Sequence, residues 1–421
     1  MPLGYTNPLF ILPFDHRSSF MKKMFGIEGR QPTAEETKLI ASYKQLIYDG
    51  FKLAVEGGGV PKESAAILTD EQFGDAVLKD AAKTGYTFCL ATEKSGSDEF
   101  DFEYGEAFAS HIEQYHPTIV KALIRYNPEE NQEMNARQRK RLEILSNFCH
   151  QSGYKFLIEP LVPASATQLE RVGNDQHRYD NEIRPALMVK MIAELQADEV
   201  EPDIWKIEGF EQPAHYEKIV AQARSGIGRG DVAAVVLGRG ADDAQVETWL
   251  RAGAGVDGIV GFAIGRTIFW QPLVDYKENK ISAEQATRKI SDNYLRFYSL
   301  FIKENTQKAK INPVAPNHLK YKVILPRPFG IAGRLFVSVF FTYFALVLLP
   351  FGIAFPGSGV DTLGHVFIAG LPFILVPILY GIKKLRQGDK VSAFVLLAPP
   401  CLYLSDVMVA LYEILFTDRW G

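Results

Sequence analysis

The sequence predicts an α/β fold: a (β/α)8 TIM barrel over residues 1–306, a linker at 307–330 and an α-helical transmembrane region at 331–421. Three observations lead to this prediction. Short apolar runs alternate with charged helical segments, polar residues gather where those runs end, and the last part of the chain is strongly apolar. A doubly wound sheet is the alternative, but the first strand ends in Asp-His-Arg and lacks the Gly-rich fingerprint of that fold.

Nine short apolar runs are candidate strands, one more than the barrel needs. Each is bounded by polar, charged, glycine or proline residues, as strands usually are. The run at 65–68 is the shortest, and its alternative assignment is to the loop after the second strand. The candidates lie at residues 9–14, 51–55, 65–68, 86–91, 119–124, 155–158, 203–208, 233–237 and 258–264.

Amphipathic or charged segments between the runs predict helices at residues 34–50, 130–151 and 182–196. Ser282, followed by Glu284, predicts the start of a last helix that continues to about residue 304 and closes the outer ring. The formal net charge is −4, and the segment at 130–141 mixes both signs. We therefore interpret that segment as a solvated helix face and expect no nucleic-acid partner.

The apolar region contains three candidate membrane spans, at 335–355, 366–382 and 391–416. The first carries no charged residue and reaches the roughly 20 residues needed to cross a bilayer core. Lysines and arginines precede the first span and lie between the second and third, but the loop between the first two has none. The positive-inside rule then predicts a multi-pass protein of the inner (cytoplasmic) membrane with the barrel in the cytoplasm. No secretory signal starts the chain.

Lys206 is the residue around which we build the functional hypothesis. It lies inside a short apolar run that Pro202 and Gly209 bound, and strand alternation puts it on one face with Ile204 and Glu208. Burial disfavours the charged form of a lysine, and an uncharged amine can attack a carbonyl to form a Schiff base. The ordinary alternative is that Lys206 pairs with a carboxylate such as Glu208 or extends to the rim.

Three further residues at strand ends complete an imine-forming constellation. Lys121 is a second cation that favours the uncharged form of Lys206 and engages a substrate oxygen. Glu159 and Asp15 are carboxylates placed to move protons during carbinolamine dehydration and carbon–carbon cleavage. Ion pairing with the same two lysines is the alternative for both carboxylates.

The last two strands end in glycine and arginine, where such barrels often bind phosphate. Arg239 and Arg266 can add charge-assisted bonds to that phosphate, although tight turns are the ordinary explanation for the glycines. Arg17 extends the first strand end and contacts substrate, or serves in a cap or ion pair. The substrate-binding and phosphate-binding candidates are Arg17, Gly238, Arg239, Gly240, Gly265 and Arg266.

Three motifs resemble a known family: Leu-Pro-Phe-Asp-His-Arg at 12–17, Trp-Lys-Ile-Glu-Gly at 205–209 and Gly-Phe-Ala-Ile-Gly-Arg-Thr-Ile-Phe at 261–269. Together they resemble the domain often fused behind the sugar kinase of myo-inositol catabolism, 5-dehydro-2-deoxygluconokinase. That domain in turn is similar to the class I tagatose-bisphosphate aldolases, which are (β/α)8 barrels with a lysine Schiff base. The resemblance covers about residues 8–304.

The resemblance implies roles for five residues. The Schiff-base lysine falls on Lys206, the catalytic glutamate on Glu159, the second active-site lysine on Lys121, the first-strand aspartate on Asp15 and the phosphate-side arginine on Arg266. The implied substrate is 6-phospho-5-dehydro-2-deoxygluconate, split into dihydroxyacetone phosphate and malonate semialdehyde.

We therefore expect a class I aldolase, a carbon–carbon lyase that needs no metal and no cofactor. The expected partners are a phosphorylated sugar and, through the C-terminal helices, the membrane; a homo-oligomer is left open. The alternative function is a non-catalytic phosphosugar-binding domain that regulates a partner from the membrane. In that case Arg266 and the glycines at the strand ends bind the phosphosugar, and Lys206 is not needed.

Overall fold

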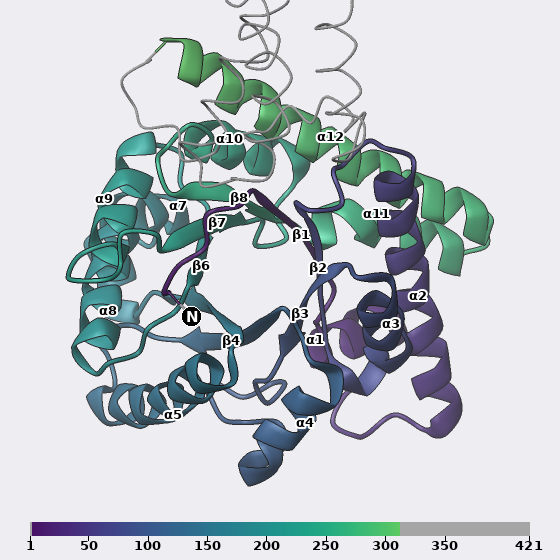
Figure 1. Cartoon of the computed structure of the whole chain (residues 1–421), viewed down its shortest axis with the longest axis horizontal. Coiled ribbons are helices and arrows are strands. Elements are labelled where there is room, and N and C mark those ends of the chain that lie inside the picture. Colours follow the sequence, from purple (N-terminus) through teal and green to yellow (C-terminus); the bar gives the residue numbers. More distant parts are fainter. Residues whose placement is uncertain (1, 312–421) are drawn as a thin grey trace, which may run out of the picture. The chain divides into compact units, whose positions relative to one another are not determined.

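The computed structural model of the chain describes residues 2–311. Eight parallel strands pair in chain order and close into a barrel, with helices around it (Figure 1). This confirms the predicted barrel. The strands are β1 (Leu9–Pro13), β2 (Ala65–Thr69), β3 (Thr87–Ala91), β4 (Ile119–Arg125), β5 (Lys155–Leu161), β6 (Ile204–Glu208), β7 (Ala233–Leu237) and β8 (Ile259–Ala263).

Helices follow the strands and form the outer ring. Several begin with a side-chain cap; Thr33 and Glu36, for example, form a reciprocal capping box at the start of α2. The helices are α1 (Ser18–Phe20), η1 (Met21–Phe25), α2 (Ala34–Glu56), α3 (Glu71–Thr84), η2 (Gly105–Ala107), α4 (Phe108–Tyr115), α5 (Gln132–Ser152), α6 (Ala166–Arg171), α7 (Gln176–Arg178), η3 (Tyr179–Ile183), α8 (Arg184–Ala197), α9 (Pro213–Ala223), α10 (Asp243–Gly253), α11 (Arg266–Lys277) and α12 (Ala283–Ile311).

One candidate strand is wrong. Residues 51–55 form the last turns of α2, and the run at 65–68 is a true strand, β2. Phe51, Ala54 and Val55 continue the buried stripe to which Ile47 and Tyr48 belong, at the three- and four-residue spacing of a helix. A short apolar run at the end of a helix can therefore be mistaken for a strand.

Alternation along each strand separates two buried environments. On β6, Trp205 and Ile207 belong to the hydrophobic cluster that includes the surrounding helices, whereas Ile204 is equally buried but lies outside that cluster. Because successive side chains of a strand point to opposite faces, Ile204 and Lys206 face the barrel interior. This alternation fixes the direction of the amine of Lys206.

Asp203 organises the end of the barrel where the strands begin. Its carboxylate accepts hydrogen bonds from the backbone amides of Gly4 and Phe156, both at 2.8 Å, and pairs with the Lys155 amine at 2.8 Å. The N-terminal segment is thereby attached beneath β5 and β6. Burial raises the pKa of the neighbouring Tyr5 to about 12.

The last described helix covers the first strand. The hydroxyl of Tyr294 in α12 donates to the carbonyl of Phe10 in β1 at 2.7 Å, and the Phe10 ring contacts the rings of Tyr298 and Phe301 edge-on. The helix closes the outer ring as predicted, but it continues to Ile311, past the predicted end near residue 304 and into the predicted linker.

The predicted localisation in the inner membrane is wrong: within residues 2–311, no helix is both long enough and apolar enough to cross a membrane. The three expected spans, at 335–355, 366–382 and 391–416, and the remainder of the linker lie outside the described residues.

Candidate active site

The candidate site lies at the carboxyl ends of the strands. Asp15 follows β1, Glu93 follows β3, and Lys121, Glu159 and Lys206 lie on β4, β5 and β6. In a closed parallel barrel all of these ends form one rim, where such folds carry their active sites. The four predicted catalytic residues come together there, and Glu93 joins them.

Lys121 is the centre of this cluster. Its side chain is fully buried, and its amine lies 2.7 Å from Oδ2 of Asp15, 2.7 Å from Oε1 of Glu93 and 3.0 Å from Oε2 of Glu159. Burial alone would lower the pKa of Lys121, but the three carboxylates outweigh it and hold the pKa well above the usual range. Lys121 is therefore a permanent ammonium ion.

Lys206 shares a carboxylate with Lys121. Its amine lies 2.8 Å from Oε2 of Glu159, the same oxygen that faces Lys121, and its side chain is 4% exposed. Burial would raise the pKa of Glu159, but the charges of Lys121 and Lys206 lower it below its usual value. Glu159 is thus an ionised acceptor in contact with both amines.

The end of the first strand contributes a charged carboxylate, Asp15, and a neutral imidazole, His16. Burial would raise the pKa of Asp15, but Lys121 and Lys206 hold it well below its usual range. The adjacent His16 has its Nδ1 at 3.9 Å from Oδ1 of Asp15, and this buried nitrogen has no hydrogen-bond partner among the described residues. Burial lowers the pKa of His16 to about 4, so its imidazole is neutral near pH 7.

Arg17, for which substrate contact or an ion pair was predicted, bonds to groups of the protein itself. It is buried, pairs with Glu103 at 2.8 Å and donates to the carbonyl of Glu93. Burial would lower the pKa of Arg17, but neighbouring carboxylates raise it. Arg17 therefore supports the segment that carries Glu93. Sequence reasoning missed Glu93 as a site residue, although Thr92-Glu93-Lys94 follows its strand just as Asp15 follows β1.

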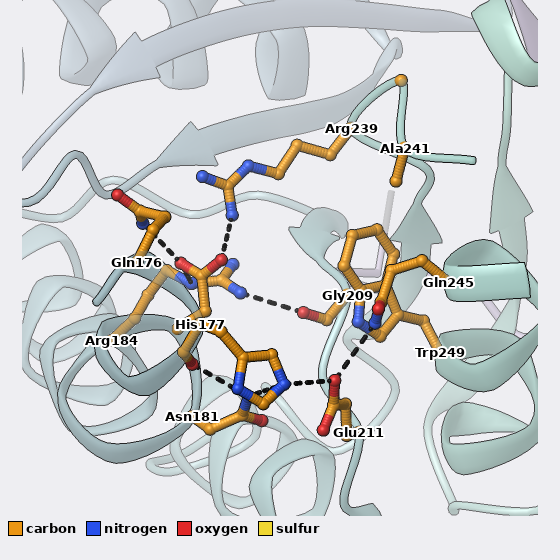
Figure 2. Close-up of a pocket in the computed structure, with 12 residues that line it drawn as sticks. Gln176, His177, Asn181, Arg184, Gly209, Glu211, Arg239, Ala241, Gln245 and Trp249 are labelled. Carbon is orange, nitrogen blue, oxygen red and sulfur yellow. Dashed lines mark hydrogen bonds and ion pairs between the residues drawn. The ribbon is translucent and has the colours of Figure 1, made fainter.

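Arg239 is also paired within the protein. Its guanidinium lies 2.7 Å from Oδ2 of Asp180 and 3.3 Å from Oε1 of Glu208, on the wall of a pocket of about 430 Å³ (Figure 2). Glu208, the alternative partner considered for Lys206, faces Arg184 at 3.3 Å as well. Among the ion pairs of residues 2–311, Lys206 pairs with Glu159 and Glu208 pairs with the two arginines, so the carboxylates of β5 and β6 serve different cations.

Arg266 starts α11 and is held by a glycine turn. Its guanidinium donates to the carbonyl of Arg239 at 2.8 Å. Gly240 has φ +71°, and a Cβ there would lie 2.4 Å from Cζ of Arg266.

Two more glycines lie in the loops at this rim. A Cβ on Gly265, the residue before α11, would lie 2.2 Å from the carbonyl oxygen of Pro13, and one on Gly238 would contact Ile264 at 3.3 Å. The glycines therefore permit the close approach of these loops.

Arg266 differs from Arg239 in its charge environment. Burial lowers the pKa of Arg266, opposed by the charge of Glu159. The ion pairs within residues 2–311 include none to Arg266, whose charge is therefore available to an anion.

A cavity of about 210 Å³ opens onto the charged cluster. Its wall includes Asp15, His16 and Glu159, together with Leu123 and Arg125 from the end of β4. The cluster is consequently accessible to a small molecule that enters from the rim of the barrel.

The profile of a protein family described as "Uncharacterized protein conserved in bacteria (DUF2090)" matches residues 4–305. No curated protein matches the chain. A solved fructose-bisphosphate aldolase from Plasmodium falciparum, in complex with TRAP and a small-molecule inhibitor, is 11% identical, with 70% of this chain and 90% of that chain covered and a TM-score of 0.50. A Schiff base forming fructose-1,6-bisphosphate aldolase is 13% identical, covering 70% and 94%, with a TM-score of 0.41. At such identities the first match supports the fold alone.

Proposed function

For this chain, which belongs to the DUF2090 family, we propose the function of a Schiff-base (class I) aldolase, a lyase that cleaves a phosphorylated keto sugar acid. One observation carries the proposal: the amines of Lys206 and Lys121 lie 2.8 Å and 3.0 Å from the same oxygen of Glu159. Asp15 and Glu93 already hold Lys121, so Glu159 is left to serve the amine of Lys206. Two lysines and a cavity suit a nucleophile beside a fixed cation.

Imine formation uses Lys206 and Glu159. Glu159 accepts a proton from the Lys206 ammonium, and the free amine attacks the keto carbon of the substrate. The protonated Glu159 then gives that proton to the carbinolamine hydroxyl, which leaves as water and yields a protonated imine. Lys121 stays charged throughout and holds the carboxylates of Asp15, Glu93 and Glu159 in place.

Carbon–carbon cleavage uses Asp15. Its carboxylate takes the proton from the hydroxyl on the carbon β to the imine carbon, the bond between the α and β carbons breaks, and an aldehyde leaves. The bonding electrons move to the imine nitrogen and form an enamine. Protonation of the enamine carbon by Asp15 and hydrolysis of the imine release the second product and restore Lys206.

The phosphate of the substrate is assigned to Arg266 and the backbone amides of Arg239 and Gly240. Arg266 carries a charge without an ion-pair partner among the described residues, and the N-terminus of α11 adds its dipole. The proposed substrate is 6-phospho-5-dehydro-2-deoxygluconate, which this reaction splits into dihydroxyacetone phosphate and malonate semialdehyde.

Borohydride trapping tests the mechanism. The full-length chain is mixed with the phosphorylated keto sugar acid, borohydride is added, and the intact mass is measured beside Lys206→Met. We expect a stable adduct that maps to Lys206 and is absent from the variant, because reduction fixes an imine irreversibly.

An exposed lysine provides the control. Lys79, which is 63% exposed on α3, is replaced by methionine, and this variant should form the adduct as the wild type does. Binding of the phosphosugar without any adduct would refute the lyase and favour a non-catalytic phosphosugar-binding domain.

A further inference from the structure

Arg125 is a cavity residue that the proposed reaction does not use. It is the last residue of β4, and alternation puts it on the same face as Lys121 and Leu123. Asp15 and Glu159 line the same cavity. A ligand near the two catalytic carboxylates is therefore within the space that Arg125 borders.

The charge of Arg125 is not neutralised by a carboxylate. Its guanidinium donates to the carbonyl of Ser97 at 2.9 Å, and the ion pairs within residues 2–311 include none to Arg125. Five acidic residues line the cavity. Asp15, Glu93 and Glu159 face Lys121, Glu99 pairs with Arg137 and Arg141, and Asp98 is exposed and pairs with none of the arginines among the described residues. A partly buried guanidinium with one neutral partner is a site for an anion.

The barrel places Arg125 opposite the proposed phosphate site. The strands close in chain order, so three strands separate β4 from β8 on either side. Arg125 ends β4, Arg266 follows β8, and Lys206 lies on β6, midway between them. A substrate bound to both arginines would span the mouth of the barrel, with Lys206 on the wall between its two ends.

We infer that Arg125 binds a second anionic group of the substrate, at the end opposite its phosphate, and that this group is a carboxylate. The inference rests on the proposed function and assigns to Arg125 the recognition of the acid end of its substrate. A carboxylate carries one charge, whereas a second phosphate would bring about two into a cavity lined also by Asp15, Glu93 and Glu159. The single charge costs less repulsion.

The test compares three ketose phosphates that share a phosphomethyl ketone and differ at the far end. These are the keto sugar acid, fructose 1-phosphate with a neutral end, and fructose 1,6-bisphosphate with a second phosphate. Affinities are measured by calorimetry in the Lys206→Met background, so that binding is separated from imine chemistry. Borohydride trapping by the chain with Lys206 intact is recorded in parallel.

We expect Arg125→Gln to weaken binding of the keto sugar acid by roughly 10- to 100-fold and to leave fructose 1-phosphate unchanged. Arg125→Lys should recover part of the loss. The control is Arg288→Gln, at a 69% exposed position on α12, which should change no affinity.

Equal binding of the acid and the neutral-ended sugar, or an equal loss of both in Arg125→Gln, would overturn the inference. Preference for the bisphosphate would overturn the carboxylate in favour of a second phosphate. If an imine is trapped but Arg125→Gln weakens all three sugars equally or none of them, the lyase stands and only the inference about Arg125 is refuted. If Arg125→Gln weakens the keto sugar acid selectively but no imine is trapped, the inference stands and the lyase is refuted.

Discussion

Lys206 lies 2.8 Å from the Glu159 oxygen that also stands 3.0 Å from Lys121. Glu159, which lines the cavity, is therefore the link between the buried amine of Lys206 and an ammonium ion held by two further carboxylates. Any proton that Glu159 accepts changes the field at both lysines. This relationship makes Glu159 the most sensitive position in the cluster.

Glu159→Gln should lower the rate of imine formation by about 10²- to 10⁴-fold, because the amide can neither accept the proton from Lys206 nor return it to the carbinolamine. This rate is measured by adding borohydride to samples taken at successive times and quantifying the trapped adduct. Glu182→Gln, at a 50% exposed position paired with Arg178, is the control. An unchanged trapping rate in Glu159→Gln would remove Glu159 from the proton path.

Lys121→Met should lower the free energy of unfolding by about 3–5 kcal/mol near neutral pH, because three carboxylates lose their shared cation. Urea unfolding with a circular dichroism readout measures the change. Lys22→Met, at a 57% exposed position, should have little effect. A loss no larger than in this control would show that the three carboxylates do not depend on Lys121.

The same variant should reverse the pH dependence of stability. In the wild type, the folded pKa values of Asp15 and Glu159 lie below their usual 3.8 and 4.5. Their contribution is therefore present above those usual values and lost as pH falls through the folded values. Without Lys121, burial should raise the folded pKa values above the usual ones, so that the variant gains stability as pH falls from neutral toward those usual values. A parallel decline with acid in both proteins would contradict this.

Gly240→Ala should weaken binding of phosphorylated ketoses by roughly tenfold or more, because the added Cβ displaces the guanidinium that the phosphate needs. The matched control is Gly228→Ala. Gly228 also has a positive φ, +84°, but nothing lies within 4 Å of its added Cβ. Calorimetry on both variants separates the displacement of Arg266 from backbone strain; equal effects would refute the role of the turn.

Asp203→Asn should destabilise the barrel by about 2–4 kcal/mol and leave imine trapping intact, since Asp203 lies at the end away from the site. Burial would raise its pKa, but the nearby His150 and the hydrogen bonds from Lys155 and two backbone amides hold the pKa below the usual 3.8. Its contribution is present above that value and lost in acid, so the variant and wild type should converge as pH falls. Asp231→Asn, at an exposed position, is the control.

The strand ends were predictable because alternation and chain order are local properties. A lysine between apolar neighbours on β6 must face one side or the other, and the parallel barrel brings Asp15, Lys121 and Glu159 to the same rim. Their convergence followed from the fold class once the strands were placed.

The partners of the arginines were not predictable in this way. Arg17 pairs with Glu103, 86 positions away, and Arg239 with Asp180, 59 positions away. Such contacts depend on the conformation of the loops above the rim, which no periodic pattern in the sequence specifies. Glu93 was overlooked for a related reason, because nothing in the sequence around Glu93 indicates that it contacts Lys121.

The contact of Tyr294 with Phe10 has a consequence for protein synthesis. β1 leaves the ribosome first, but its neighbour β8 and its cover α12 are the last described elements to be made. Until then, the nascent chain has an unpaired strand edge and an uncovered phenylalanine, the features that promote association between unfinished chains. The barrel therefore closes only after nearly the whole domain has been translated, which makes the growing chain a natural client for chaperones.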